Sequence, residues 1–471
     1  MKFFLQGEWQ DRDAVIEVRN PFDGSVLDTV PCATDADVET ALATATNGAV
    51  TMAATTGYER FEILRRAADL IRERAGDLAH TISSEAGKPI TEARIEVGRG
   101  AQTLELSGEE AKRLGGEVLP LDGSQGVKGK LGFTLRVPCG IVAAVSPYNF
   151  PLNLVAHKIG PALAAGNAVI LKPASDTPLT ALKLVEILLE AGMPPLALSC
   201  LTGSGATVGN AICSDPRVRK ISFTGSRKVG EAICQAAGLK KVTMELGSNC
   251  PLIVLPDADI NLAAEAIAVS GYANAGQVCI STQRVITHQS VHDELMQAVT
   301  PLVQHLKAGN QLQDDTKVGP LIRESDAERV ESWIKEAKAD GASLICGGNR
   351  NGSLVQPALL DAATTDMRIC QEELFGPAVS VMNANDVADA IRLANDSDYG
   401  LGAGIFTQDI DAAMRFAREV HSGNIHINSG PMWRADLMPY GGLKYSGMGK
   451  EGPKYAVEEM TETKSVVIHS K

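Results

Sequence analysis

Two side chains in the middle of the sequence are candidates for acyl chemistry. Cys279 lies in Asn274–Ser281 (NAGQVCIS), between an expected helix and an expected strand, where a thiol can be exposed. Glu245 lies at the end of the apolar strand Val242–Leu246, and a carboxylate there is costly unless it is paired or reactive. Such a thiol and carboxylate could form a thioester and activate the water that hydrolyses it. A random cysteine is more often a small buried hydrophobe, and none of the eight histidines lies in a protease signature.

Two glycine-rich turns could bind phosphate groups. Gly203–Gly209 (GSGATVG) follows a strand and opens a helix, but its spacing departs by one residue from the dinucleotide fingerprint. Phe223–Ser226 (FTGS) also precedes a helix, whose free N–H groups and dipole would favour a pyrophosphate. Each is equally a tight strand-to-helix turn, so the residues alone leave both interpretations open.

The elements that would position these residues alternate between short apolar strands and helices. Strands are expected before Pro251 at Val137–Val145, Ala168–Leu171, Leu198–Leu201, Lys220–Phe223 and Val242–Leu246. Strands are expected after it at Arg284–Thr287, Val379–Met382, Gly402–Phe406 and Asn424–Ile427. This alternation predicts an α/β fold, with a parallel doubly wound sheet and then a second α/β unit. Pro251 and Pro256 bracket the expected junction.

Two further segments, Leu131–Val137 and Thr463–His469, have the pattern of exposed strands. Such strands usually find a partner, often in another subunit.

The composition narrows the class of protein. A chain of 471 residues exceeds one ordinary core, so two or three units are expected. A net charge of −13 argues against binding to nucleic acid or to an anionic membrane. Nine cysteines without CxxC spacing favour free thiols in a reducing compartment, and no apolar run is long enough for a membrane span. We therefore expect a cytoplasmic protein without a metal site.

Several short motifs follow one another along the chain. They are Pro147–Pro151 (PYNFP), Lys172–Ser175 (KPAS), Phe223–Ser226 (FTGS), Glu245–Gly247 (ELG), Gly276–Cys279 (GQVC), Glu373–Pro377 (ELFGP) and Pro439–Gly442 (PYGG). In this order and at these separations they resemble the hydrolytic, non-acylating aldehyde dehydrogenases, over essentially the whole chain.

The resemblance implies a fold of three parts and an oligomer. The parts are a Rossmann-like coenzyme domain at residues 1–116 and 137–247, a catalytic α/β domain at 248–454, and a β-strand oligomerisation extension at 117–136 and 455–471. A homodimer or a homotetramer is expected.

The resemblance also assigns catalytic roles. Cys279 would attack the aldehyde, and the Asn149 side-chain amide with the Cys279 main-chain N–H would stabilise the oxyanion. Glu245 would activate the water that hydrolyses the thioester. In isolation Asn149 would be a turn residue and Glu245 a structural ion-pair partner. Family members that transfer the acyl group to coenzyme A lack this glutamate, so its presence favours hydrolysis.

The implied cofactor is NAD or NADP. Lys172 would hold the adenosine ribose, Glu373 the nicotinamide ribose, and Phe375 would press against the ring region. Gly225 and Ser226 would face the pyrophosphate, so the other glycine-rich turn is expected to be structural. In isolation Lys172, Glu373 and Phe375 would be a strand-end lysine, a surface glutamate and a core phenylalanine.

Ser175 departs from the pattern of strictly NAD-dependent members, which often carry a glutamate there. Serine removes the repulsion of a 2′-phosphate and could donate a hydrogen bond to it. We therefore predict that NADP is accepted. Ser248 departs from the usual second glycine, and a small residue is expected to be tolerated.

The substrate is expected to be a small polar aldehyde. The succinate-semialdehyde branch uses two arginines, and the matching positions here are His157 and Ala273, which disfavours that substrate. An aromatic content of 4% argues against a pocket for bulky apolar aldehydes. The surrounding sequence is most similar to the lactaldehyde and glyceraldehyde type, so a short hydroxyaldehyde is expected. Phosphonoacetaldehyde or sulfoacetaldehyde is the alternative.

Candidate substrate contacts are Tyr148, His157, Arg284, Trp433 and Arg434. Each has a plainer explanation as a packed, structural or surface residue. Rival functions are a coenzyme A-acylating dehydrogenase, an esterase-like thioester enzyme without redox chemistry, and a non-catalytic structural homologue. The last should have lost one of the three catalytic candidates, and all three are present.

Overall fold

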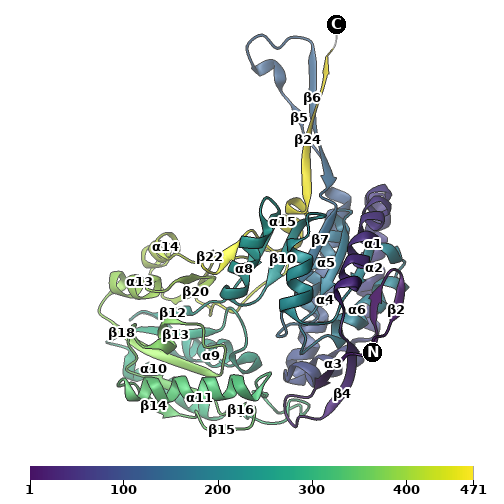
Figure 1. Ribbon diagram of the computed structural model, residues 1–471. Helices are drawn as coiled ribbons and strands as arrows, with labels where there is room; N and C mark the ends of the chain where they lie inside the picture. Colours follow the sequence, from purple (N-terminus) through teal and green to yellow (C-terminus); the bar gives the residue numbers. More distant parts are fainter. Residues whose placement is uncertain (470–471) are drawn as a thin grey trace.

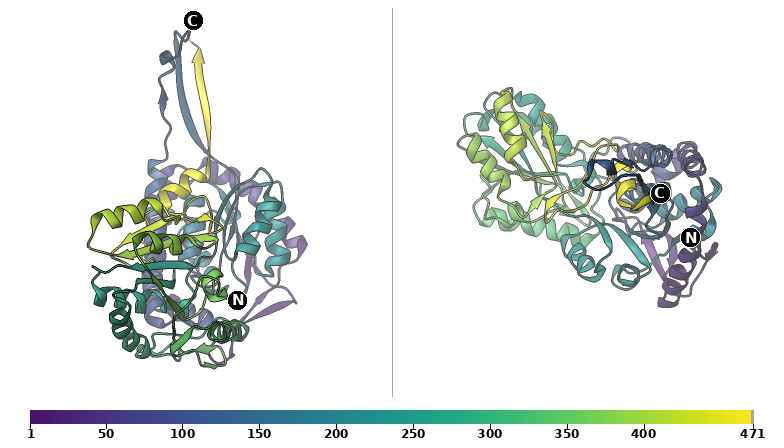
Figure 2. Two further views of the ribbon diagram at one scale, coloured as in Figure 1. Left: turned by 90° about the vertical axis from the view of Figure 1, so that its left-hand side faces the viewer. Right: turned by 90° about the horizontal axis from the view of Figure 1, so that it is seen from above.

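The computed structural model describes residues 1–469, which form two α/β lobes and a long β arm (Figure 1). The views in Figure 2 show the lobes side by side and the arm projecting from them, with the C-terminal strand along it.

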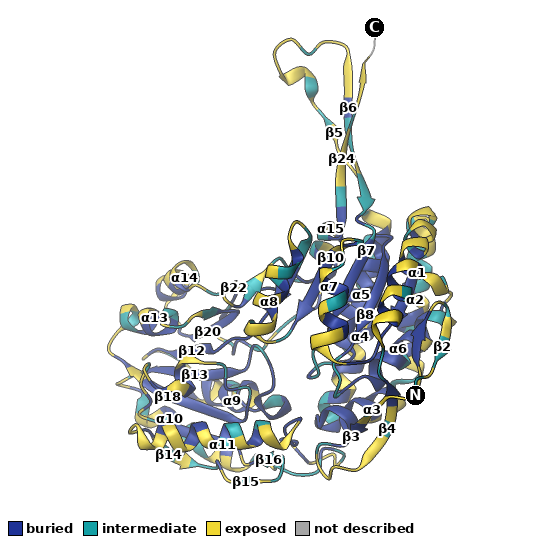
Figure 3. Ribbon diagram, viewed as in Figure 1, coloured by how far each residue is buried: buried dark blue, intermediate teal, exposed yellow. Residues whose placement is uncertain are grey.

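The first lobe is built on an eight-stranded sheet in the order β2-β1-β9-β8-β7-β10-β11-β23. In that order the strands are Glu8–Gln10, Phe3–Leu5, Leu198–Cys200, Ala168–Lys172, Ile141–Val145, Val218–Thr224, Lys241–Glu245 and Gly447–Met448. The five strands from β9 to β11 are parallel. Every residue of β7 and β8 is buried, which explains their continuous apolar sequences (Figure 3).

Helices surround this sheet and supply the rest of the lobe. They are α1 (Asp35–Ala54), α2 (Gly57–Glu73), α3 (Ala75–Ala86), α4 (Ile90–Arg113), α5 (Asn153–Ala164), α6 (Leu179–Glu190), α7 (Asn210–Ser214), α8 (Arg227–Ala237) and α15 (Pro453–Glu459). α5 packs against β7, β8 and α4 and is buried along its whole length. A two-stranded hairpin of β3 (Val15–Arg19) and β4 (Val26–Pro31) extends from this lobe.

The second lobe has a seven-stranded sheet in the order β14-β17-β18-β13-β12-β20-β21. These strands are Ser343–Cys346, Ala358–Asp361, Ala378–Ala384, Thr282–His288, Cys250–Val254, Gly402–Phe406 and Asn424–Ile427. Its helices are α9 (Ile260–Ser270), α10 (His292–Gln304), α11 (Glu324–Ala339), α12 (Arg368–Gln371), α13 (Val387–Asn395) and α14 (Ile410–Glu419). The short pairs β15–β16 (Arg350–Asn351, Leu354–Val355) and β19–β22 (Tyr399–Gly400, Leu443–Lys444) complete it.

The arm is a three-stranded antiparallel sheet in the order β24-β6-β5. Its strands are Thr461–His469, Lys130–Pro138 and Val118–Leu119. The two exposed strands expected from the sequence therefore pair with each other, from Thr461 opposite Pro138 to His469 opposite Lys130. β24 remains an edge strand.

One segment near the C-terminus bridges the lobes. β23 joins the first sheet, where Gly447 pairs with Glu245 of β11. In the sequence, however, β23 comes after every strand of the second sheet. This crossing brings the PYGG segment next to the end of β11.

The structure corrects the expected junction at Pro251. Pro251 lies inside β12, which pairs with β13 on one side and β20 on the other. The pairing of β12 with β13 shifts its register between Cys250 and Pro251, and such an irregularity accommodates a residue without an N–H donor. The proline therefore marks a bulge in a central strand and not a linker.

Two other expected elements are divided. The run Val137–Val145 is broken at Gly140, whose φ of +118° ends β6 and begins β7. The helix expected before the Cys279 segment ends at Ser270, and a short 3₁₀ turn follows at Ala273–Gly276. Within residues 1–469, no helix is both long and apolar enough to cross a membrane. That same range contains no cluster of three or more His, Cys, Asp or Glu side chains arranged to hold a metal ion.

Candidate active site

The loop that carries Cys279 has an unusual backbone. Asn274, Ala275 and Gly276 all have left-handed φ values, of 49°, 56° and 70°. A Cβ on Gly276 would stand 2.1 Å from the Gly376 carbonyl oxygen, so glycine is required where this loop meets the next one. Buried Gln277 then fixes the loop, since its side-chain amide donates to the Asn274 carbonyl and its oxygen accepts from the Ile322 N–H. The nucleophile candidate therefore sits on a rigid support.

Asn149 lies directly beside this loop. Its side chain is buried, and its amide nitrogen donates to the Gln277 carbonyl at 2.8 Å. Asn274 in turn donates to the Asn149 main-chain carbonyl at 3.3 Å. The Asn149 amide nitrogen carries two hydrogens and this bond uses one, so the second remains for another acceptor. The Cys279 main-chain N–H donates to no acceptor within residues 1–469.

Glu245 lies at the end of β11 and is only 3% exposed. Neither of its carboxylate oxygens has a hydrogen-bond partner among the described residues. Burial, and then the neighbouring carboxylate of Glu451, raise the pKa of Glu245 well above its ordinary value, against the opposing charges of Arg434 and Lys158. A buried, unpartnered carboxylate of this kind is typical of a working acid or base.

The Cys279 sulfur is partly exposed and contacts Tyr440. Sulfur and phenol oxygen lie 3.1 Å apart, and either group can donate. Burial raises the pKa of the Cys279 thiol to about 12, while the Tyr440 hydrogen bond acts in the opposite direction. The carboxylates of Glu373 and Glu245 also raise this pKa. Tyr440 belongs to the PYGG motif, but sequence reasoning assigned it no role.

Gly441 explains how Glu245 approaches this group. A Cβ on Gly441 would stand 2.8 Å from a Glu245 carboxylate oxygen. The residue next to Tyr440 therefore has to be small for the carboxylate to lie there. Asn149, Glu245 and Cys279 come from different elements and are brought to one place.

Arg434 joins the same group. Its guanidinium lies 3.8 Å from the centre of the Tyr440 ring and donates to Glu451 at 3.2 Å. Lys158 also donates to Glu451, at 3.1 Å. Two cations therefore share the Glu451 carboxylate.

His157 is fully buried, and its side chain is held on both sides. Its Nε2 lies 2.9 Å from Asp436, and its Nδ1 lies 3.4 Å from Arg434 Nη2. Burial lowers the pKa of His157, which favours the neutral ring. It positions Arg434 and Asp436, and it is not placed to contact a substrate directly.

The structure corrects the expected role of Arg284 as a substrate contact. It is the largest fully buried side chain of the described residues. Its guanidinium donates to the carbonyls of Leu393 and Ala394, at 2.8 and 3.2 Å, near the end of α13, and to Asn249. Arg284 therefore satisfies the last carbonyls of a helix and does not face a substrate.

Trp433 and Tyr148, the two aromatic candidates for substrate contact, differ in their exposure and in the rings that they contact. Trp433 is 61% exposed and packs edge-on against His426. Tyr148 is partly buried, and its ring is perpendicular to that of Phe375 with centroids 6.0 Å apart.

The residues expected to hold the cofactor have geometry that fits it. Lys172 ends β8 with a nearly buried ammonium group that has no hydrogen-bond partner in residues 1–469, and burial lowers its pKa to about 8. Ser226 is the N-cap of α8, and its hydroxyl makes no capping bond. A Cβ on Gly225 would stand 2.5 Å from the Phe223 ring, so only glycine fits this turn. The helix start is open to a pyrophosphate.

A hydrogen bond and close packing fix the position of the Glu373 carboxylate. It accepts the Ser248 N–H at 3.0 Å, and burial raises its pKa to about 7. A Cβ on Gly247 would stand 2.2 Å from its other oxygen. Phe375 follows with a φ of 52°, so this loop is strained in the same way as the Cys279 loop that it meets.

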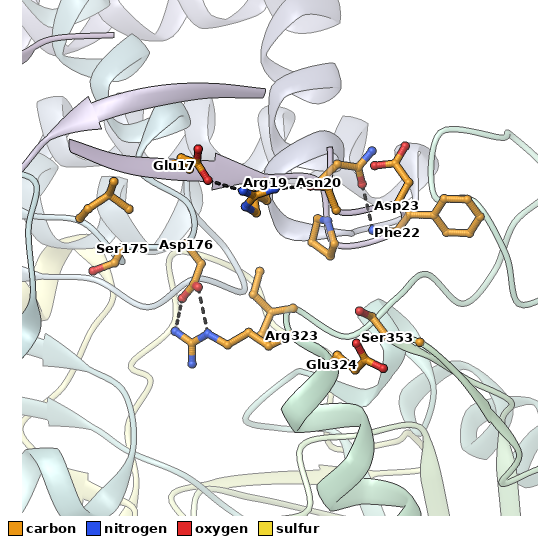
Figure 4. Close-up of a pocket in the computed structure, with 15 residues that line it drawn as sticks. Glu17, Arg19, Asn20, Phe22, Asp23, Ser175, Asp176, Arg323, Glu324 and Ser353 are labelled. Carbon is orange, nitrogen blue, oxygen red and sulfur yellow. Dashed lines mark hydrogen bonds and ion pairs between the residues drawn. The ribbon is translucent and has the colours of Figure 1, made fainter. Parts of the chain in front are cut away.

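Ser175 lines a cleft that the other expected cofactor residues do not line. Its hydroxyl donates to the Gly203 carbonyl at 2.9 Å. It lines a cleft of about 570 Å³ together with Asp176 and Arg323, which are paired with each other (Figure 4). Neither Cys279 nor Lys172 lines this cleft.

Comparisons with known proteins agree with this arrangement. The model of the aldehyde dehydrogenase family matches residues 9–466. A 3-sulfolactaldehyde dehydrogenase of Priestia megaterium is 45% identical over 99% of this chain and 97% of its own length. A lactaldehyde dehydrogenase of Methanococcus aeolicus is 40% identical over 99% of this chain and 100% of its own length.

Solved structures give the same result. Aldehyde dehydrogenase 21 of Physcomitrella patens, in complex with the reaction product succinate, has a TM-score of 0.97 and 40% identity, covering 99% of this chain and 98% of that one. Glyceraldehyde-3-phosphate dehydrogenase of Methanocaldococcus jannaschii, complexed with NADP, has a TM-score of 0.93 and 38% identity, covering 97% and 99%. The chain belongs to the aldehyde dehydrogenase family, and it catalyses the NAD(P)-dependent oxidation of an aldehyde to an acid.

Proposed function

We propose that the chain oxidises a short 2-hydroxyaldehyde to the corresponding acid through a thioester on Cys279. The observation that carries this proposal is the proximity of three groups: the Cys279 sulfur, the unpartnered Glu245 carboxylate and the Asn149 amide, which has one hydrogen left to donate. The relatives named for lactaldehyde and 3-sulfolactaldehyde, both 2-hydroxyaldehydes, support the substrate class.

Each of these residues has a defined task. The Cys279 sulfur adds to the aldehyde carbon, and the free Asn149 hydrogen with the Cys279 N–H stabilises the resulting oxyanion. When bound, the nicotinamide ring supplies the oxidising equivalent that converts this adduct into a thioester. Glu245 then accepts a proton from the water that attacks the thioester, releasing the acid and the Cys279 thiol.

Cofactor binding is assigned to the residues that the resemblance implies, of which Lys172 and the Ser226 hydroxyl have no other hydrogen-bond partner among the described residues. Lys172 holds the adenosine ribose, Ser226 and Gly225 face the pyrophosphate, and Glu373 with Phe375 positions the nicotinamide end. The relatives solved with NADP, and one from Staphylococcus aureus solved with NAD⁺, support a nicotinamide cofactor. Because the Ser175 hydroxyl already donates to Gly203, it is the absence of a carboxylate at position 175 that admits the 2′-phosphate of NADP.

A second candidate substrate class is an aldehyde that carries an acid group, such as sulfoacetaldehyde or phosphonoacetaldehyde. Arg434 and Lys158 both donate to Glu451. Arg434 also stacks on the Tyr440 ring that contacts Cys279, so Arg434 is the cation available to an acid group of the substrate. 3-Sulfolactaldehyde would satisfy both classes, since it has a 2-hydroxyl group and a sulfonate.

The test is a panel of aldehydes assayed with both cofactors. Lactaldehyde and propanal form a matched pair that differs only in the 2-hydroxyl group. We expect a higher kcat/KM for lactaldehyde than for propanal, turnover with NADP⁺ as well as NAD⁺, no requirement for coenzyme A, and loss of turnover in Cys279→Ala with cofactor binding retained. Equal use of the matched pair, or a higher kcat/KM for succinate semialdehyde, would overturn the substrate class.

A further inference from the structure

Tyr440 is a buried residue that contacts the reacting sulfur but has no task in the steps above. It is 3% exposed, and its main chain is fixed by reciprocal hydrogen bonds with Glu451. Its hydroxyl has no hydrogen-bond partner among the described residues other than Cys279. A buried phenol usually satisfies its hydroxyl, so this contact accounts for the whole polar end of the side chain.

The charges around the sulfur make a donor there important. The titratable groups that act on Cys279 are Glu373 and Glu245, which are carboxylates, and Cys250. All three disfavour a thiolate, as burial does, whereas the Tyr440 hydroxyl favours it. Among the described residues, Tyr440 is therefore the group placed to stabilise negative charge on this sulfur through a side-chain hydrogen bond.

The face of the Tyr440 ring is also occupied. The Arg434 guanidinium lies 3.8 Å from the ring centre, and Glu451 holds it there. A cation over an aromatic ring draws on its electrons and makes the phenolic O–H a stronger donor.

We propose that the Tyr440 hydroxyl donates a hydrogen bond to the Cys279 thiolate, and that Arg434, stacked on the ring, strengthens this bond. Tyr440 is then a catalytic residue, since it touches the reacting atom. The inference rests on the proposed role of Cys279. It explains how a thiol surrounded by carboxylates becomes nucleophilic.

The experiment follows the alkylation of Cys279 by iodoacetamide as a function of pH, with the Cys279 peptide quantified by mass spectrometry. Tyr440→Phe keeps the ring under Arg434 and removes one oxygen. We expect the midpoint of alkylation to move up by about one pH unit, and the rate below the midpoint to fall about tenfold. Tyr272→Phe is the matched control, because its buried hydroxyl bonds the Ala358 carbonyl and should leave the profile unchanged.

A second variant covers the case in which Tyr440→Phe does not fold. Arg434→Lys keeps a cation for Glu451 but removes the planar group from the ring, and it should move the midpoint in the same direction by less. An unchanged profile in the folded Tyr440→Phe enzyme, or in Arg434→Lys if the first variant is unfolded, overturns the inference. Retained turnover in Cys279→Ala would instead overturn the proposed function, so the two failures are distinguishable.

Discussion

At the scale of single residues, the site depends on groups that lack ordinary partners. Among the residues that the structure describes, the Glu245 carboxylate has no hydrogen-bond donor and the Lys172 ammonium has no acceptor. A folded protein leaves a buried polar group without a hydrogen bond only where a water molecule or a ligand can bond to it. Here the substrate water and the cofactor would do so.

The ionisation of Glu245 predicts the pH dependence of turnover. Its pKa is raised, so the carboxylate needed as a base becomes populated only as the pH rises through that value. The Cys279 pKa is raised as well, so thiolate formation changes in the same direction. We predict that kcat at saturating substrate rises with pH across the range above that in which an ordinary glutamate titrates. A steady-state pH profile measures this, and a kcat that falls over this range would be incompatible with Glu245 as the base.

Candidate catalytic residues could be predicted from the sequence, but the groups that each side chain contacts could not. Cys279, Glu245 and Asn149 were recognisable because each stands in a motif. Arg284 was a candidate substrate contact with a plainer explanation as a structural arginine, and only the folded chain shows the helix carbonyls that it satisfies. Tyr440 was missed because the sulfur that it contacts lies 161 positions away in the sequence.

At the scale of elements, the segment around Arg434 is fastened to two helices of the first lobe. Asp436 accepts two hydrogen bonds from Arg99 on α4, at 2.8 and 3.0 Å, and lies 2.9 Å from His157 on α5. Burial alone would raise the pKa of Asp436, but the bonds from His157 and Arg99 hold it well below its ordinary value.

This attachment predicts a loss of stability in Asp436→Asn. A carboxylate whose pKa is lowered by folding stabilises the protein above the unfolded pKa, and that contribution is lost as the pH falls through the folded value. We expect a loss of about 2 kcal/mol near pH 7, because a largely buried ion pair is removed while Arg99 keeps some contact with solvent. Urea unfolding at pH 7 and at about pH 4 measures this, and most of the difference from the parent should persist at the lower pH, because the folded pKa of Asp436 lies well below the ordinary value.

Asp69→Asn is the matched control for that measurement. Asp69 pairs with Arg65 and Arg72 on an exposed helix surface, so its loss should cost less than about 0.5 kcal/mol. Equal effects of the two substitutions would contradict the attachment of the Arg434 segment through Asp436.

The positions of elements were largely predictable, because buried parallel strands and amphipathic helices have distinct periodicities. Pro251 was misread as a junction, since a proline usually disrupts a central strand and the bulge that admits it depends on the neighbouring strand. The crossing of β23 to the first sheet could not be predicted from local patterns, because two residues carry no periodicity.

At the scale of the whole molecule, the arm projects from the two lobes instead of packing into either of them (Figure 1). Leu131, Leu135 and Ile468 lie on one face of it and are 52%, 45% and 52% exposed. An edge strand with exposed apolar neighbours is a surface that another chain can cover. The resemblance implies an oligomerisation extension in this part of the chain, and we predict that the arm joins copies of this chain.

The double variant Leu131→Lys/Ile468→Lys tests this assembly. Light scattering after gel filtration should show a lower molar mass than for the parent protein, because two charges would be buried at the contact. Leu239→Lys is the control, since Leu239 is fully exposed on the first lobe and its replacement should leave the mass unchanged. A parent protein that is already monomeric would contradict the prediction.

The central claim is that Cys279 forms the thioester and Glu245 activates the water that removes it. The most direct test is Glu245→Gln, mixed with cofactor and the best aldehyde of the panel, then quenched and digested. We predict a burst of about one equivalent of reduced cofactor, a Cys279 peptide heavier by the acyl group, and turnover slowed by about 100-fold or more. Undiminished turnover with no acyl group on the Cys279 peptide would contradict the account.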